Sequence, residues 1–500
     1  MTFRGTERPS GGAHSIMEMR ATAEGTAKSE VLPCLCVDLD GTLIQGDTLV
    51  ESLIVLLRTR PWRLLVLLLW FFRGKARFKH ELGRLVTLQP DQLPYEPSVL
   101  EYLRSESKRG RTMLLVTGAD ASVAHPVAAH LGLFSQVICS NERENITGTR
   151  KLAAILGVLG SEEFSYAGNS RTDLPVWRRA KTAVVAGGSP RLLKAVRRLG
   201  VEVENVFVAP RFSFLTILRA MRVYQWTKNI LVLLPLALSH RLFVFQGLVT
   251  GIRAFFAFSL CASAIYLAND ILDLPNDRRH HRKKHRPLPS GRLSVPAALG
   301  LIVLFLAGSV ALNPTPKAAW LLAAYVASTL AYSLYVKRLL IIDVILLAGF
   351  YTLRLLYGGA AELVTVSIWT LSFSMFMFLS LALIKRISEL QSGVSEEGLA
   401  TSGRAYLLTD LFQMSALCAA SGCVGALVII LYVNSPEVVV LYSRPHLLLG
   451  IFPLLIYWQS RLLILANRGA IHVDPIIFSL TDRASRAVAV ALLVLVLAAI

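Results

Sequence analysis

The hydrophobic and polar positions divide the chain into two unlike parts. Before residue 230 the apolar runs are short and separated by charged stretches, as in an α/β domain with buried parallel strands. Beyond it, apolar segments of membrane length alternate with short polar connections. The pattern predicts an α/β domain, followed by an all-α polytopic membrane domain of about nine transmembrane helices. The nine segments lie at about 230–247, 250–270, 294–312, 318–336, 339–359, 364–384, 411–433, 446–465 and 486–500.

This change in pattern along the chain predicts two domains. We expect the α/β domain over 31–205 and the membrane domain over 206–500. Residues 1–30 combine Gly, Ser, Thr, Arg and Glu without an apolar segment, so we expect a disordered lead and no signal peptide. An apolar stretch at 53–72, broken by charge, predicts a helix against the membrane surface or the second domain, or one buried in its own domain.

Composition and charge narrow the function classes. The 500 residues carry a formal net charge of +19, and 54% of them are hydrophobic. The mean hydropathy of +0.54 is typical of a multispanning membrane protein. The basic residues gather between the apolar segments, which fits membrane lipids or phosphate substrates and argues against nucleic acid. Six cysteines form no CxxC pair, which indicates reduced core residues and not a zinc site.

The basic connections also predict the topology. They alternate along the chain, at 278–292, 337–338, 385–386 and 461–486. The positive-inside rule places these connections in the cytoplasm, together with the domain before the first span. We therefore expect a multi-pass protein of the inner (plasma) membrane with a cytoplasmic N-terminal domain. The sequence leaves open whether the protein forms a homo-oligomer.

Three carboxylates follow the second apolar segment: Asp270, Asp273 and Asp277, with Asn269 just before them. Their spacing places them on one face of a helix, where like charges repel unless a cation lies between them. Oxygen ligands without His or Cys favour a hard ion such as Mg2+, which also binds phosphate. Because ionisable groups at a membrane helix end are costly, this cluster predicts a functional site.

A second pair of carboxylates lies in the first domain. The apolar run at 31–37 predicts a buried strand and leads into DLDGT, which contains Asp38 and Asp40. Reactive groups in an α/β sheet lie at such strand ends. We expect Asp38 to attack phosphorus as the nucleophile and Asp40 to act as acid and then base. Mg2+ would balance the phosphate charge.

The DLDGT motif resembles that of the haloacid dehalogenase (HAD) phosphohydrolase superfamily. On this resemblance Thr117 is the phosphate-binding hydroxyl, and Lys151 neutralises the nucleophile and the phosphate. GNSRTD at 168–173 is similar to the acidic metal motif, with Asn169 and Asp173 as ligands beside Asp38 and Asp40. Asn169 stands where the family usually has Asp, so the site loses one negative charge. A non-catalytic, regulatory domain therefore stays an alternative.

A further polar cluster lies in the membrane domain, at Tyr332, Lys337, Asp343 and Arg354. Asp343 and Arg354 are eleven residues apart, about three helical turns, and so share one helix face. They predict a carboxylate and a phosphate-binding guanidinium that line one cavity. The alternative is an ion pair within the membrane that only orients helices.

The acidic motif, with the basic run behind it, resembles the first aspartate-rich motif of the UbiA superfamily of membrane prenyltransferases. QWTKN at 225–229, Lys385-Arg386 and Asp474-Pro475 are similar to its polyprenyl-phosphate phosphoribosyltransferase branch, and the resemblance covers about 220–500. It implies transfer of a 5-phosphoribosyl group from phosphoribosyl diphosphate to a polyprenyl phosphate. The residues expected to bind substrate or phosphate are Asn269, Lys283, Arg286, Tyr332, Lys337, Asp343, Arg354, Lys385 and Arg386.

In this interpretation Asp270, Asp273 and Asp277 are catalytic, since the Mg2+ that they hold binds the diphosphate. The HAD-like domain would remove the 5-phosphate from the lipid-linked product. Many superfamily members carry a second acidic motif of the form DxxxD, but Leu347 stands at its last position here. The alternative function is transfer of a prenyl chain from a prenyl diphosphate to an aromatic or other acceptor, with a regulatory HAD-like domain.

Overall fold

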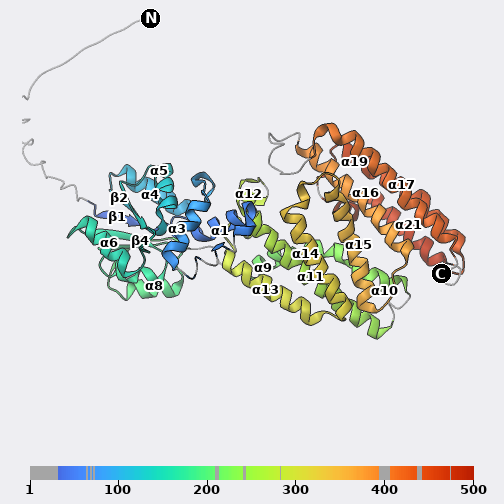
Figure 1. Ribbon diagram of the computed structural model, residues 1–500, viewed down its shortest axis with the longest axis horizontal. Helices are drawn as coiled ribbons and strands as arrows, with labels where there is room; N and C mark the ends of the chain where they lie inside the picture. Colours follow the sequence, from blue (N-terminus) through green and yellow to red (C-terminus); the bar gives the residue numbers. More distant parts are fainter. Residues whose placement is uncertain are drawn as a thin grey trace, which may run out of the picture.

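The computed structural model describes residues 32–499 except 64–65, 68–69, 71, 73, 209–212, 240–243, 282, 394–405, 436–437, 439–441 and 473. The predicted lead at 1–30 lies outside the described residues, as does part of the stretch at 53–72. A sheet domain and a helical domain lie side by side along the long axis (Figure 1), with helix α1 (Thr48–Thr59) at their junction.

The first domain is the predicted α/β domain. Its six parallel strands have the order β3-β2-β1-β4-β5-β6. The strands are β1 (Cys34–Val37), β2 (Met113–Asp120), β3 (Gln136–Ser140), β4 (Phe164–Gly168), β5 (Thr182–Val185) and β6 (Glu202–Val206). The helices, besides α1, are α3 (Lys75–Leu85), α4 (Pro97–Lys108), α5 (Ala121–Leu131), α6 (Thr149–Leu159), α7 (Leu174–Trp177) and α8 (Pro190–Arg197).

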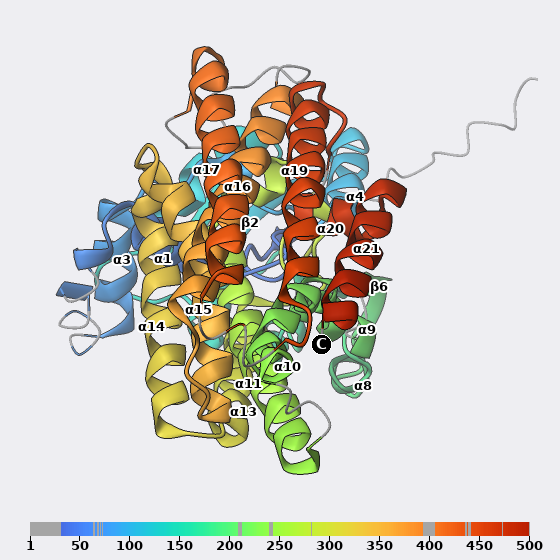
Figure 2. The same cartoon turned by 90° about the vertical axis from the view of Figure 1, so that its right-hand side faces the viewer.

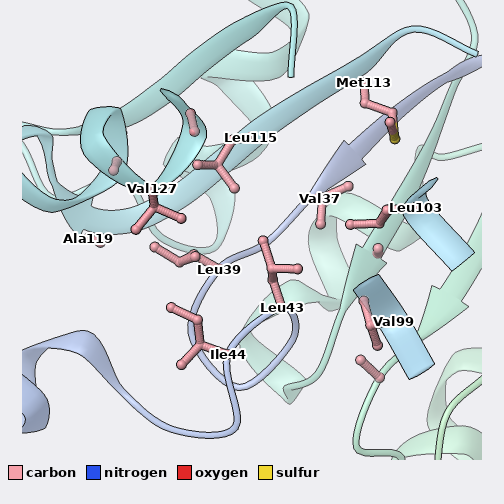
Figure 3. Packing of buried hydrophobic residues seen from close by; sticks show 14 of the residues in the cluster. Val37, Leu39, Leu43, Ile44, Val99, Leu103, Met113, Leu115, Ala119 and Val127 are labelled. Atoms are coloured by element: carbon pink, nitrogen blue, oxygen red, sulfur yellow. The ribbon is translucent and has the colours of Figure 1, made fainter. Parts of the chain in front are cut away.

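The central strand β1 divides the hydrophobic core into two layers. Its residues alternate between the faces of the sheet, so that Leu35 and Val37 join one buried cluster and Cys36 joins the other. Leu39 and Leu43, in the loop after β1, are fully buried in the first cluster (Figure 3). This packing holds the DLDGT loop firmly against the end of the strand.

The second domain is helical. Its helices are α9 (Phe214–Met221), α10 (Leu234–Leu238), α11 (Phe245–Leu272), α12 (Leu274–Arg279), α13 (Val295–Leu312), α14 (Pro316–Leu334), α15 (Ile342–Glu362), α16 (Ile368–Gly393), α17 (Leu411–Val433), α19 (Ile451–Asn467), α20 (Pro475–Thr481) and α21 (Arg483–Ala499). The long helices run roughly alongside one another (Figure 2). A 3-10 segment, η4 (Val223–Leu233), leads into α10.

Among the described residues, six helical segments are long and apolar enough to cross a membrane. They are α11, α13, α15, α16, α17 with the preceding 3-10 turn (Leu408–Val433), and α19 with the preceding 3-10 segment (Pro445–Asn467). The prediction of about nine spans is therefore too high for this part of the chain. The segment at 230–247 begins as η4 and a five-residue helix, and α21 has 17 residues. Helix α14 has 19 residues but carries a lysine and several hydroxyl side chains.

Candidate active sites

The first site lies at the carboxyl end of β1, where Asp38 begins the loop to α1. Asp38 is 7% exposed, and its Oδ1 lies 2.9 Å from the Nζ of Lys151. Lys151 comes from α6, is itself buried, and donates to the hydroxyl of Tyr166 at 2.9 Å. Since both partners are buried and hydrogen-bonded, the carboxylate is held in one position, which suits a nucleophile.

Asp40 is held by the start of the next helix. Its Oδ1 accepts a hydrogen bond of 2.8 Å from the backbone N–H of Thr48, the first residue of α1. Between them Gly41 has a φ of 73°, and a Cβ there would come within 1.9 Å of the side-chain nitrogen of Asn169. Glycine is required here for two reasons: other residues rarely adopt this left-handed backbone conformation, and a side chain would clash with Asn169. The turn thus brings Asn169 against the DLDGT loop.

Burial changes the titration of both acids. Desolvation raises the pKa of Asp38 to about 7, although the charge of Lys151 lowers it. Desolvation also raises the pKa of Asp40. A carboxylic acid that keeps its proton closer to neutral pH can donate that proton to a leaving group, the role expected of Asp40.

Thr117 lies near this loop through the register of the sheet. Val37 of β1 pairs with Leu115 of the parallel strand β2. Asp38, one residue after Val37, and Thr117, two residues after Leu115, therefore lie toward the same edge of the sheet. Thr117 is fully buried, and its hydroxyl accepts a hydrogen bond of 3.0 Å from the N–H of Ala119. The hydroxyl proton is thereby left for another acceptor.

Asp173 supports the lysine. It accepts a hydrogen bond of 2.9 Å from the hydroxyl of Tyr166, and its Oδ1 lies 3.5 Å from the Nζ of Lys151. Its other oxygen accepts from the backbone N–H of Ser170 at 3.1 Å. Asp173 is thereby placed to orient Lys151.

The oxygens of Asp38, Asp40 and Asn169 form a donor set that fits Mg2+, and the close packing of Asn169 on Gly41 holds that amide at the loop. Within the described ranges, no group of three or more His, Cys, Asp or Glu side chains has the arrangement of a metal site. The proposal that Asp38, Asp40, Asn169 and Asp173 bind Mg2+ stays a prediction.

The acidic motif of the membrane domain is not one continuous helix, contrary to the prediction. Helix α11 ends at Leu272, Asp273 caps it, and α12 begins at Leu274. Pro275, in the first turn of α12, has no N–H and cannot continue the hydrogen bonding of α11. The side chain of Asp273 is 37% exposed at this break.

Asp270 and Asp277 are nevertheless joined across the break. Both are buried, and the Nη1 of Arg286 lies 3.1 Å from Oδ1 of Asp270 and 2.7 Å from Oδ2 of Asp277. Arg222 makes a second ion pair with Asp270. Lys283 lies 3.5 Å from Asp277. Each buried carboxylate therefore faces two cations.

Asp273 and Asn269 extend the same cluster. Oδ1 of Asp273 lies 3.3 Å from the Nζ of Lys337, which follows α14. Oδ1 of Asn269 is buried and has no hydrogen-bond partner in the described part of the chain. A buried polar atom without a partner costs about 1–3 kcal/mol. This orphaned oxygen suits a hard cation such as Mg2+. Among the described residues, however, the three aspartates pair with basic side chains and are not arranged together as a metal site.

The polar cluster farther along the chain is an ion-pair network. Asp343 is fully buried, and it accepts hydrogen bonds from Nε of Arg386 at 2.8 Å and from the hydroxyl of Tyr406. Arg386 also donates to Tyr332 at 2.8 Å and to Glu389 at 2.6 Å. Because Asp343 belongs to α15 and Arg386 to α16, the network ties these two helices together.

Arg354 has other partners. It donates to Oδ1 of Asn229 at 3.0 Å and to the carbonyl of Phe350 at 2.6 Å. Its guanidinium lies 5.5 Å from the ring centre of Tyr325. The prediction that Asp343 and Arg354 line one cavity is therefore not supported, because other groups occupy both side chains. The alternative, an orienting ion pair, fits Asp343 with Arg386 in place of Arg354.

The sequence predicts no site role for Asp474 of the Asp474-Pro475 motif, but the structure gives it two lysine partners. Its Oδ2 lies 2.6 Å from the Nζ of Lys228 and 3.6 Å from the Nζ of Lys385. Burial opposes ionisation, but the two lysines lower the pKa of Asp474 below its usual value. Asp474 thus connects the QWTKN segment with α16, across 246 residues of sequence from Lys228.

The comparisons with known proteins agree with two domains. The model of the UbiA prenyltransferase family matches residues 230–472, and that of haloacid dehalogenase-like hydrolases matches 35–178. The chain is 35% identical over 459 residues to an uncharacterized protein, y4nM, of Sinorhizobium fredii, covering 91% of this chain and 88% of that protein.

A second relative covers less of the chain. This relative is the decaprenyl-phosphate phosphoribosyltransferase of Mycobacterium tuberculosis, to which the chain is 35% identical over 196 residues. The aligned part covers 37% of this chain and 64% of that protein. A solved UbiA homolog from Archaeoglobus fulgidus, bound to DMAPP and Mg2+, aligns with a TM-score of 0.43 and 17% identity over 56% of this chain and 98% of that one.

Proposed function

We propose, on the premise that the chain belongs to the UbiA prenyltransferase family and carries a HAD-like domain, that it moves a 5-phosphoribosyl group from phosphoribosyl diphosphate to a polyprenyl phosphate. The family makes it an integral membrane transferase of prenyl-type substrates. The partial similarity to the M. tuberculosis phosphoribosyltransferase supports the phosphoribosyl donor.

One structural observation carries this proposal: the acidic motif is surrounded by cations. Asp270 and Asp277 share Arg286, and Asp273 pairs with Lys337. A site that mixes carboxylates with guanidinium and ammonium groups can bind a diphosphate whose charge is partly balanced by a metal ion. Mg2+, when bound by Asn269 and the aspartates, would supply positive charge for the phosphate oxygens.

In the transfer step, the bond between C1 of the ribose and the diphosphate oxygen breaks, and the diphosphate leaves with the electron pair. Lys283, Arg286 and Lys337 stabilise the negative charge that grows on the leaving group. An oxygen of the polyprenyl phosphate forms the new bond to C1. Because that oxygen is already anionic, the step needs no strong base.

The first domain would act on the product. Asp38 attacks phosphorus of the 5-phosphate, and Asp40 donates a proton to the departing ribose oxygen. Water, deprotonated by Asp40, then hydrolyses the aspartyl phosphate and releases inorganic phosphate. The buried Lys151 beside Asp38 supports this role, because it can neutralise a bound phosphate. We place both steps on the cytoplasmic side, which the basic connections favour.

The test is product formation in membranes that contain the purified chain, Mg2+, polyprenyl phosphate and phosphoribosyl diphosphate labelled in the ribose. We expect label in the lipid fraction and stoichiometric release of diphosphate. Asp273→Ala should lose both, and Lys317→Ala, on the opposite side by the predicted topology, is the matched control.

The same membranes should be given a prenyl diphosphate with an aromatic acceptor. Consumption of the prenyl diphosphate, without lipid label from the phosphoribosyl donor, would replace the proposal by prenyl transfer.

A further inference from the structure

The two domains meet through a packed apolar contact. Helix α1, which follows the DLDGT loop, places Ile54 in a buried cluster with Leu267 and Ile271 of α11. Ile54 is 2% exposed and Leu267 is 1% exposed. Figure 1 shows α1 beside α12 at this junction. The helix next to the phosphatase loop is therefore part of the core of the membrane domain.

A paired ion contact lies beside this apolar core. Both terminal nitrogens of Arg278 donate to the two carboxylate oxygens of Glu51, each at 2.8 Å. The side chains are 14% and 5% exposed, respectively. A two-bond pair between arginine and carboxylate fixes direction as well as distance. About two turns farther along α1, Arg58 donates to Asn276 at 2.8 Å.

The DLDGT loop also touches the membrane domain directly. Gly291 has a φ of 72°, and a Cβ there would come within 2.3 Å of Oε1 of Gln45. Gln45 is in turn held by Glu96, to which its side-chain nitrogen donates at 2.7 Å. The basic segment behind the acidic motif therefore passes against the loop that carries the phosphatase carboxylates.

Both ends of the ion pair adjoin the chemistry. Glu51 lies three residues, about 5 Å of helix, after Thr48, whose N–H holds Asp40. Arg278 follows Asp277 directly. We propose that Glu51 and Arg278 are positioning residues, a docking clamp that holds the phosphatase loop against the acidic motif so that the lipid-linked phosphate made at one site is hydrolysed at the other without release from the chain.

The lipid substrate in this inference rests on the proposed function, whereas the docking does not. The chemical step is unchanged: a phosphate monoester and water give an alcohol and inorganic phosphate. The clamp raises the local concentration of the phosphorylated lipid at Asp38. Its loss should therefore slow the second step for the lipid but not for a small soluble phosphate ester.

The experiment compares the full-length wild type with Glu51→Gln and Arg278→Lys in membranes. Arg279→Ala is the matched control. Arg279 also reaches the first domain, 3.6 Å from Asp91 and 3.3 Å from Gln89, but it is 58% exposed, and exposed contacts of this kind add little stability. Three quantities are measured: p-nitrophenyl phosphate hydrolysis, the amount of phosphorylated lipid product during turnover, and hydrogen exchange of 48–59. We expect both clamp variants to accumulate about 10-fold more phosphorylated lipid, with faster exchange and p-nitrophenyl phosphate hydrolysis within about twofold of wild type.

Three results would overturn the clamp. Exchange of 48–59 as slow as in the wild type would show that the pair does not hold the domains together. Faster exchange with wild-type levels of phosphorylated lipid would show that docking has no role in the handover. A fall in p-nitrophenyl phosphate hydrolysis as large as the fall in hydrolysis of the lipid product would show that Glu51 acts on the phosphatase chemistry itself. If the wild type forms no lipid product, the proposed function fails, and hydrogen exchange alone decides the docking.

Discussion

The two candidate sites differ in how their carboxylates are balanced. In the described part of the first domain, Asp38 and Asp173 share Lys151 as their ion-pair partner. The charge of Lys79 acts on the nearby Asp40. In the membrane domain, three aspartates face four cations, Arg222, Lys283, Arg286 and Lys337. The first site has an excess of negative charge that favours a metal ion, whereas the second has enough positive charge to bind a diphosphate as well.

The two sites also differ in how they are built. Asp38 and Asp40 of the first site follow strand β1 directly, and buried Leu39 and Leu43 anchor their loop. The acidic motif instead lies at a break between α11 and α12, where Arg286 connects Asp270 to Asp277. We expect substitutions at the first site to lower catalytic activity with little effect on folding. Substitutions at the second site should lower activity and folding stability together.

The largest effect is expected for Asp38→Asn. Loss of the nucleophile should lower hydrolysis of p-nitrophenyl phosphate by about a thousandfold or more. Transfer of phosphoribosyl to lipid should stay within about twofold of wild type. Inorganic phosphate release and lipid labelling measure the two. Wild-type phosphatase activity in this variant would show that Asp38 is not the nucleophile. An equal loss of phosphatase and transfer activity would contradict two separate sites.

Asp343→Asn tests whether the buried network is structural. The buried charge of Arg386 then keeps Glu389 as its carboxylate partner among the described residues, and the free energy of unfolding should fall by about 3 kcal/mol. Thermal unfolding in detergent measures the loss. At temperatures where the variant is folded, its transfer rate should be close to wild type. A selective fall in the rate constant without loss of stability would instead restore Asp343 to the substrate site.

Arg286→Ala tests the shared cation. It removes both contacts between Asp270 and Asp277 and a charge that faces the leaving group, so transfer should fall about 100-fold. Arg286→Lys should recover part of this loss, because a single ammonium cannot reproduce both contacts. Lipid labelling gives the rates, and p-nitrophenyl phosphate hydrolysis, unaffected in both variants, is the internal control. Transfer at the wild-type rate in Arg286→Ala would remove this residue from the site.

The smallest effect concerns stability of the first domain. Burial opposes ionisation of Glu204, but hydrogen bonds from Arg111, Thr182 and Tyr102 lower its pKa to about 2. A depressed folded pKa gives stability that is present above the ordinary glutamate range and is lost as pH falls toward 2. Glu204→Gln should cost about 1 kcal/mol at pH 7. Melting curves from pH 7 to 2 should show the difference from wild type shrinking; a constant difference would contradict the ion pair.

Local sequence was enough to predict what contiguous residues do. The strand, turn and carboxylates of DLDGT lie within a few residues, so the position of Asp38 at the end of β1 follows from pattern alone. The break at Asp273 could also have been read from Pro275, whose missing N–H ends the helix. Six of the nine predicted spans are long and apolar enough in the described residues. The other three are the segment that begins as the 3-10 helix η4, the more polar α14 and the shorter α21, and apolar length alone did not distinguish them.

Long-range partners could not be predicted in this way. Arg222 pairs with Asp270 across 48 residues, and Arg386 with Asp343 across 43. No local spacing marks such pairs, because their geometry depends on how the helices pack. Asp343 and Arg354 do have helical spacing, yet Asp343 pairs with Arg386 and Arg354 donates to Asn229. The contact of Glu51 with Arg278 spans 227 residues and needed the relative placement of both domains.

The most direct measurement of the central claim uses phosphoribosyl diphosphate that carries 14C in the ribose and 32P in the 5-phosphate. Polyprenyl phosphate, Mg2+ and membranes with the wild type, Asp38→Asn or Asp273→Ala are compared. We expect lipid with 14C but without 32P for the wild type, lipid with both labels for Asp38→Asn, and unlabelled lipid for Asp273→Ala. Wild-type lipid that keeps both labels, or that carries neither, would contradict the account of two successive sites in one chain.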